Sequence, residues 1–259
     1  HRIDLGIPPF KISNPEEIDW DSPEDLFNAV VEEYFKTLRA FDPKHNKSVD
    51  REMWEDAMKG PDHLATSLIG EPLMYPKIDD LMYLGKKHGM TTFIVTNGTF
   101  PKVLERMHTL PHQLYISVVG PDFKIWANMT RPLWNAREQW ENLLKTLELV
   151  PSLGIRTVFR ITAVKGYNLI HPEKYARLIE LAQPDFVEVK GYSWVGRSRE
   201  RLPKKAQPSM EDIRSFATML EQLIGYEIKD EVPRARVVLL WNGKTLPELR
   251  PRNYKNVYK

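Results

Sequence analysis

Apolar residues along the chain recur at two spacings, and each spacing predicts a different kind of element. Leu26, Val30, Tyr34 and Leu38 repeat every four positions, as on one face of a helix, and a Ser-Pro pair typical of a helix start precedes them. We therefore predict a helix over residues 23–40. Other segments with helical spacing lie near residues 50–59, 78–89, 140–150, 175–182 and 209–224, and a short helix begins at Pro101.

Short apolar, β-branched runs separate the later helices and predict strands over residues 64–69, 91–96, 113–118, 156–164, 186–192 and 235–241. Strands alternating with helices predict a parallel α/β sheet, either an open doubly wound sheet or a whole or partial (β/α) barrel. We expect one domain over residues 1–259, with a basic tail at 244–259. In both architectures the chemistry lies at the carboxyl ends of the strands.

Composition excludes several classes of protein. Apolar residues make up 42% and charged residues 28% of the chain, close to the averages of globular domains. No apolar run approaches the roughly 18 residues of a membrane span, and no signal-peptide pattern opens the chain, so we expect a cytoplasmic protein without a membrane partner. The absence of cysteine excludes disulfides, thiolate zinc sites and a cysteine nucleophile.

Charge is distributed unevenly along the chain. The formal net charge is +2, but residues 1–33 carry nine acidic residues against two basic ones, a sum of −7. The remaining residues therefore carry +9, which favours a polyanionic partner.

Polar groups gather where the predicted strands end. These ends carry a glycine, a carboxylate, an amide, a hydroxyl and a guanidinium, in the residues Gly70, Glu71, Pro72, Asn97, Ser117 and Arg160. Glycine lets a backbone approach a ligand, and the polar groups can bind an ammonium group, sugar hydroxyls and a carboxylate. Each feature alone also fits an ordinary turn or helix start, but their shared position favours a site for an amino-acid nucleoside.

Two lysines, Lys165 and Lys190, lie in or just after apolar strands, where an unpaired ammonium group is costly. Each lysine either pairs with a carboxylate such as Glu188, or extends its ammonium group to the solvent-exposed rim, or serves a substrate. In the second case a lysine holds a keto acid by charge or forms a Schiff base with it.

The segment after the strand at 186–192 is basic and contains the aromatic residues Tyr192 and Trp194. Five cations against Glu200 give a charge of +4, from Arg197, Arg199, Arg201, Lys204 and Lys205. Cations beside aromatic rings suit RNA phosphates and a stacked base, although a charged run is often only a solvated face.

Five strings of residues occur in a specific order: 67–76 (SLIGEPLMYP), 91–98 (TTFIVTNG), 113–118 (QLYISV), 160–168 (RITAVKGYN) and 186–192 (FVEVKGY). Together they resemble the radical S-adenosylmethionine (SAM) core of the tRNA 4-demethylwyosine synthase family, over about residues 20–240. The resemblance implies a partial (β/α) barrel of parallel strands. It also implies a [4Fe–4S] cluster on three cysteines and the cleavage of SAM to a 5′-deoxyadenosyl radical.

The family joins a two-carbon piece of pyruvate to N1-methylguanosine at position 37 of tRNA-Phe. By resemblance, Gly70, Glu71 and Pro72 meet the methionine amino group of SAM. Asn97, Ser117 and Arg160 would then line the cofactor, and Lys165 and Lys190 would face the substrates.

The chain departs from the family in having no cysteine to ligate the cluster. Because it does not begin with methionine, we expect it to be part of a longer, monomeric protein that carries the cluster loop upstream. The alternatives are a radical SAM enzyme with another substrate and a non-catalytic RNA-binding barrel.

Overall fold

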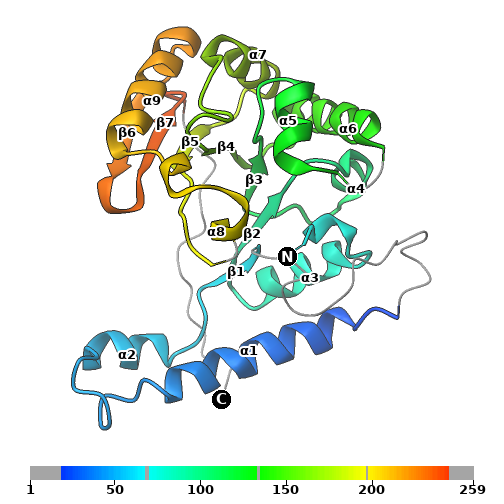
Figure 1. Cartoon of the computed structure of the whole chain (residues 1–259). Helices are drawn as coiled ribbons and strands as arrows, with labels where there is room; N and C mark the ends of the chain where they lie inside the picture. The colour runs from blue at the N-terminus through cyan, green and yellow to red at the C-terminus, as the bar shows by residue number, and fades with distance from the viewer. Residues whose placement is uncertain (1–18, 68–69, 133–134, 197, 245–259) are drawn as a thin grey trace.

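The structure is a computed structural model that describes residues 19–67, 70–132, 135–196 and 198–244. Its α-helices are α1 (Pro23–Arg39), α2 (Arg51–Ala57), α3 (Ile78–Lys87), α4 (Pro101–Arg106), α5 (Phe123–Thr130), α6 (Ala136–Leu149), α7 (Pro172–Ala182), α8 (Ser198–Arg201) and α9 (Met210–Ile224). Its strands are β1 (His63–Thr66), β2 (Thr91–Thr96), β3 (Gln113–Ser117), β4 (Arg156–Ala163), β5 (Phe186–Gly191), β6 (Glu227–Val232) and β7 (Val237–Trp241). The described strands form one sheet in the order β1-β2-β3-β4-β5-β7-β6 (Figure 1).

Strands β1 to β5 are parallel neighbours, and the chain passes through one or more helices between each strand and the next. The predicted α/β fold, a partial (β/α) barrel with parallel strands, is therefore confirmed, in a sheet that is mostly parallel and not closed. The expectation that every strand is parallel is wrong, because β7 pairs antiparallel with both β5 and β6. After α9 the chain forms a hairpin of β6 and β7, and a hairpin reverses the chain without a crossover helix.

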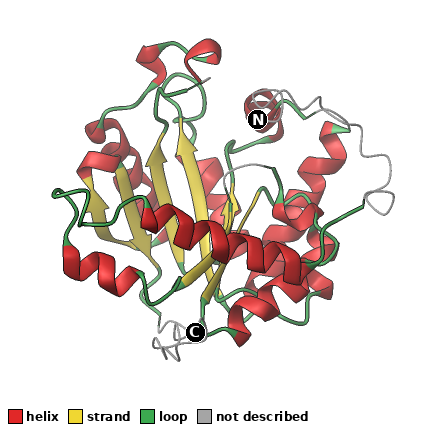
Figure 2. Cartoon of the chain, turned by 90° about the horizontal axis from the view of Figure 1, so that it is seen from below, coloured by secondary structure: helices red, strands yellow, loops and turns green. Residues whose placement is uncertain are grey.

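One face of the sheet packs against helices, and the other carries the polar residues. On the helix-covered face, Ile116, Phe159, Val187 and Leu240 have no solvent exposure. Side chains alternate between faces along a strand, so the intervening residues of β2, β3, β4 and β5 are mostly half-buried on the opposite face. The helices around the sheet are seen from a second side in Figure 2.

Local signals account for most element boundaries. Asp50 caps α2 by accepting a hydrogen bond from the Met53 amide, and Ser209 and Asp212 form a capping box at α9. The pattern missed α5, in which Trp126 is the one buried residue. It also missed β6, whose six residues are all exposed and therefore show no alternation.

Helix α1 lies against α3, and α2 packs beside the end of α1 (Figure 1). The Tyr34 hydroxyl donates to the Ala57 carbonyl at 2.9 Å, and the Trp54 indole donates to the Leu38 carbonyl at 2.9 Å. Phe27 of α1 is buried and contacts the His88 ring, with 4.6 Å between ring centroids. In the described part of the chain, no helix has the length and apolar character to cross a membrane. Residues 245–259 of the predicted basic tail lie outside the described residues.

Candidate functional site

The carboxyl ends of the parallel strands bring most of the predicted site residues to one rim. Ser117, Arg160 and Glu188 are register partners on β3, β4 and β5, so they form one row across the sheet. Asn97 follows Thr96, whose partner is Ile116, and therefore lies level with Ser117. We call this set, Asn97, Ser117, Arg160 and Glu188, the polar row.

Glu71 joins the loop after β1 to the end of β2. Its carboxylate accepts hydrogen bonds from the Thr96 hydroxyl at 2.7 Å, the Asn97 amide at 2.7 Å and the Leu73 amide at 3.2 Å. Burial raises the pKa of the Glu71 carboxyl group, and these three hydrogen bonds oppose the increase. Glu71 is therefore a rigid acceptor at the rim, held by the protein's own donors.

The residues beside Glu71 set the shape of this corner. Gly70 has a φ of +81°, a left-handed conformation that favours glycine, while Pro72 begins the short 3-10 helix η3 (Pro72–Met74). The Asn97 side-chain oxygen accepts from the Thr99 amide at 2.9 Å and the Thr99 hydroxyl at 2.7 Å. The corner is thus organised before any ligand arrives.

Arg160 lies in the middle of the polar row and is already paired. Its Nε donates to Glu188 at 2.7 Å and its Nη2 at 3.3 Å, and its guanidinium carbon lies 4.2 Å from the Tyr115 ring centroid. The Arg160 and Glu188 side chains are 22% and 14% exposed. Burial raises the pKa of the Tyr115 phenol, and the charge of Glu188 adds to the increase. Two donors of Arg160 therefore bind Glu188, although the sequence had suggested a ligand carboxylate.

Tyr115 was not among the predicted site residues. Its position two residues before Ser117 on the same strand face was a signal that could have found it, because such positions share a face.

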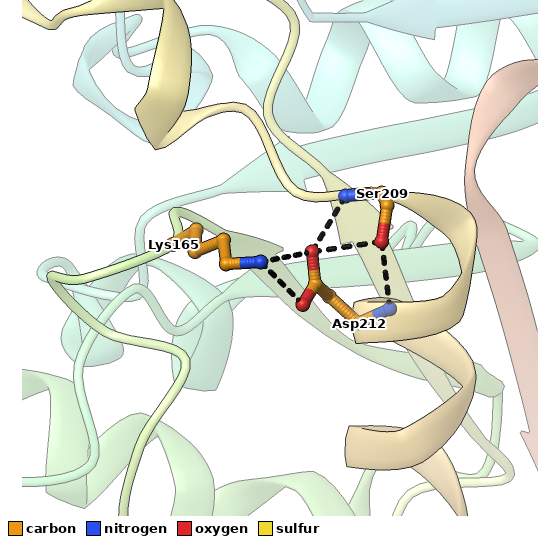
Figure 3. Close-up of polar contacts among 3 residues, drawn as sticks. All are labelled: Lys165, Ser209 and Asp212. Carbon is orange, nitrogen blue, oxygen red and sulfur yellow. Dashed lines mark hydrogen bonds and ion pairs between the residues drawn. The ribbon is translucent and has the colours of Figure 1, made fainter.

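The two candidate lysines differ in their surroundings. Lys165 donates to both oxygens of Asp212, at 2.7 and 2.9 Å, and Asp212 also accepts from the Ser209 amide and hydroxyl (Figure 3). The hydrogen bond from Lys165 is the largest cause of the lowered pKa of Asp212. Lys165 is therefore attached to the first turn of α9.

Lys190 lies next to the polar row, on the same face of β5 as Glu188 and level with Thr162 of β4. It is exposed, and within the described residues its ammonium group has no hydrogen bond or ion pair. Lys190 is thus accessible at the rim, whereas Lys165 is bound to a carboxylate.

The predicted basic segment follows β5 at the same rim. Arg199, Arg201, Lys204 and Lys205 are exposed, while Arg197 lies outside the described residues. The Arg199 guanidinium carbon is 5.1 Å from the Trp194 ring centroid, and the indole nitrogen of Trp194 donates to the Leu202 carbonyl at 2.9 Å. We call residues 192–205 the basic loop.

The donor set can be tested against the two cofactors that the resemblance implies. A half-buried carboxylate with amide and hydroxyl groups at neighbouring strand ends fits the amino-acid and ribose parts of SAM. An iron–sulfur cluster does not fit these residues, because the chain has no cysteine and the described part contains no group of three His, Asp or Glu suited to a metal.

Comparison with known proteins gives consistent results. The family profile described as "Wyosine base formation" matches residues 181–242, and that of the "Radical SAM superfamily" matches residues 36–179. The S-adenosyl-L-methionine-dependent tRNA 4-demethylwyosine synthase of Pyrococcus abyssi is 43% identical over 233 residues, covering 88% of this chain and 67% of that protein. The human enzyme TYW1 is 32% identical over 238 residues, covering 90% of this chain and 32% of that protein.

Two solved structures share the fold. "Structure of TYW1 with a lysine-pyruvate adduct bound" has a TM-score of 0.78 and 31% identity, covering 90% of this chain and 74% of that one. "Crystal structure of archaeal TYW1" has a TM-score of 0.75 and 28% identity, covering 92% and 76%. The chain therefore belongs to the tRNA 4-demethylwyosine synthase family of radical SAM enzymes.

Proposed function

We propose that this chain forms the substrate site of an enzyme that makes 4-demethylwyosine from N1-methylguanosine-37 of tRNA-Phe and pyruvate. SAM, bound at the corner of Gly70, Glu71 and Pro72, would be the source of the radical. The three predicted residues Asn97, Ser117 and Arg160 extend from that corner across the rim. These 259 residues contain no cysteine that could ligate the cluster.

The observation that carries the proposal is the accessible amine of Lys190 beside the polar row. A neutral lysine amine adds to the C2 carbonyl of pyruvate, and loss of one water leaves a C=N bond. One related solved structure is described as holding a lysine–pyruvate adduct. Lys165 is the weaker candidate, because its ammonium group must first leave both oxygens of Asp212.

Reductive trapping tests this assignment without depending on cluster chemistry. The full chain is incubated with labelled pyruvate and borohydride, and the label is located by peptide mass mapping. We expect the label on Lys190, its loss in Lys190→Met, and its retention in Lys165→Met. A label on Lys165 would transfer the role to that residue, and no label on either lysine would refute imine formation in this chain.

The basic loop supports tRNA as the polyanionic substrate. Exposed cations beside Trp194 suit phosphate contacts and a stacked base, and the loop directly follows the strand that carries Lys190. The proposal keeps the expected monomeric state, because one chain brings the polar row and the basic loop to one rim. It also keeps the expected cytoplasmic location and lack of a membrane partner, which suit an enzyme that acts on tRNA.

Salt-dependent binding of tRNA-Phe tests the role of the loop. Charge reversal at Arg197, Arg199 and Arg201 should weaken binding and flatten the log–log dependence on salt, because fewer counterions are released. Lys86→Glu/Lys87→Glu at the end of α3 is a control, since this site lies at the opposite end of the strands. Equal slopes for the loop variant and the parent would show that the loop is only solvated. If tRNA binds but no lysine is trapped, the RNA-binding barrel is favoured instead.

A further inference from the structure

The β6–β7 turn reaches the same rim as Lys190, although residues 191–193 and 233–236 are far apart in sequence. Because β7 runs antiparallel to β5, the start of β7 lies beside the end of β5, and Val237 pairs with Lys190. The Gly191 amide donates to the Arg236 carbonyl at 2.7 Å, and Arg236 Nη2 donates to the Ser193 hydroxyl at 2.9 Å. Arg236 thus joins the turn to the basic loop.

The close approach of Arg236 depends on glycine at position 191. A Cβ atom there would lie 3.1 Å from Arg236 Cβ, 3.2 Å from Pro208 Cγ and 3.3 Å from Arg236 Nε, so Arg236 and Pro208 would have to move away by a few tenths of an ångström. Arg236 itself has a left-handed φ of +52°, which is uncommon outside glycine. The turn is therefore held firmly against the end of β5.

Acidic residues predominate on strand β6, whereas the turn that follows it carries arginine. Strand β6 carries three acidic residues, Glu227, Asp230 and Glu231, and one cation, Lys229, which lies 3.7 Å from Glu227. Glu231 binds Arg214 at 2.7 Å. The turn instead carries Arg234 in the short 3-10 helix η6 (Pro233–Ala235). Arg234 is exposed, and among the described residues its guanidinium group has no hydrogen bond or ion pair.

We propose that the β6–β7 turn is a second arm of the tRNA-binding surface, in which Arg234 contacts a backbone phosphate and Arg236 holds the turn in place. The inference rests on the proposed function, since it assumes that tRNA occupies this rim. Cations on two separate segments, the basic loop and the turn, suit an extended polyanion such as an RNA backbone.

The test measures binding of tRNA-Phe to the full chain over a range of salt concentrations. Arg234→Gln should weaken binding by about threefold and lower the log–log salt slope by about one, the change expected for one lost phosphate contact. Lys87→Gln removes one charge at the opposite end of the strands and should leave both quantities unchanged. A parental slope in Arg234→Gln would overturn the inference.

A second variant tests the positioning role of Arg236. Ser193→Ala removes the acceptor of Arg236 Nη2 but retains every charge, so affinity should fall less than in Arg234→Gln while the salt slope stays parental. Unchanged affinity would exclude the hydrogen bond between the Arg236 side chain and Ser193 from holding the turn. If the parent chain itself does not bind tRNA, the proposed function fails. If the basic-loop variant loses tRNA affinity but the Arg234 and Ser193 variants keep the affinity and salt slope of the parent, this inference fails and the proposed function stands.

Discussion

The two sides of the rim differ in whether their charged groups are bound by the protein itself. At the β1–β2 side, Glu71 is half-buried and accepts three hydrogen bonds from the protein. At the β5–β7 side, Lys190 and Arg234 are exposed cations without partners among the described residues. The first side is organised by internal hydrogen bonds, whereas the second leaves its charge available.

This difference matches the ligands that we assign to each side. A small cofactor gains affinity from groups already held in place, because less conformational freedom is lost on binding. A keto acid and a polyanionic RNA instead require accessible amines and cations. The contrast between Lys165 and Lys190 shows the same principle, because a lysine bound to a carboxylate is stabilising the fold while an unpaired one can act on a substrate.

The largest expected effect is at the organised side. Glu71→Ala leaves three donors without their acceptor and should lower the free energy of unfolding by about 3 kcal/mol, measured by chemical denaturation. It should also weaken SAM binding by about 1.5–3 kcal/mol in calorimetry. Thr96→Val removes one of these hydrogen bonds but keeps the carboxylate, so it should retain most of the SAM affinity. Unchanged SAM affinity in Glu71→Ala would remove Glu71 from the cofactor site.

An intermediate effect is expected at the centre of the rim. Glu188→Ala leaves the Arg160 guanidinium unpaired in a largely buried position and should destabilise the fold by about 2 kcal/mol. The single variants Arg160→Leu and Glu188→Leu each leave one charge alone, whereas the double variant Arg160→Leu/Glu188→Leu leaves none. The double variant should therefore lose less free energy of unfolding than the sum of the two single losses. Additive losses in denaturation experiments would show that the two residues do not act as a pair.

The smallest effect separates the two lysines. Lys165→Met should cost about 0.5 kcal/mol of unfolding free energy at neutral pH, since the ion pair is half exposed, whereas Lys190→Met should cost nothing measurable. The folded-state pKa of Asp212 is lowered, so this stabilisation is present above the unfolded value of 3.8 and is lost as pH falls through the folded value. Denaturation curves at neutral and acidic pH measure the change. Equal stability of the two variants at neutral pH would contradict the structural role of Lys165.

The pattern of apolar residues was sufficient to predict the five parallel strands and most of the helices. For the helices, burial of one side produces a periodic spacing that is visible in a single sequence, as in α9. For the strands the signal was a short run of β-branched and apolar residues, as in Thr91–Thr96. The predicted strands end next to Glu71, Asn97 and Ser117, and the carboxyl ends of parallel strands lie at one rim. Where burial does not alternate, as in β6, the pattern contained no signal.

Pairings across long sequence separations were decided only by the tertiary structure. Arg160 and Glu188 are 28 residues apart, and Lys165 and Asp212 are 47 residues apart. Local spacing identified these residues as charged and near strand ends, but not which carboxylate each cation reaches. The partner of Arg160 depends on the register of β4 and β5, and the partner of Lys165 depends on the position of the first turn of α9. The direction of β7, which brings Arg236 to the rim, likewise follows from hairpin pairing, since a strand's own residues do not specify the orientation of its neighbour.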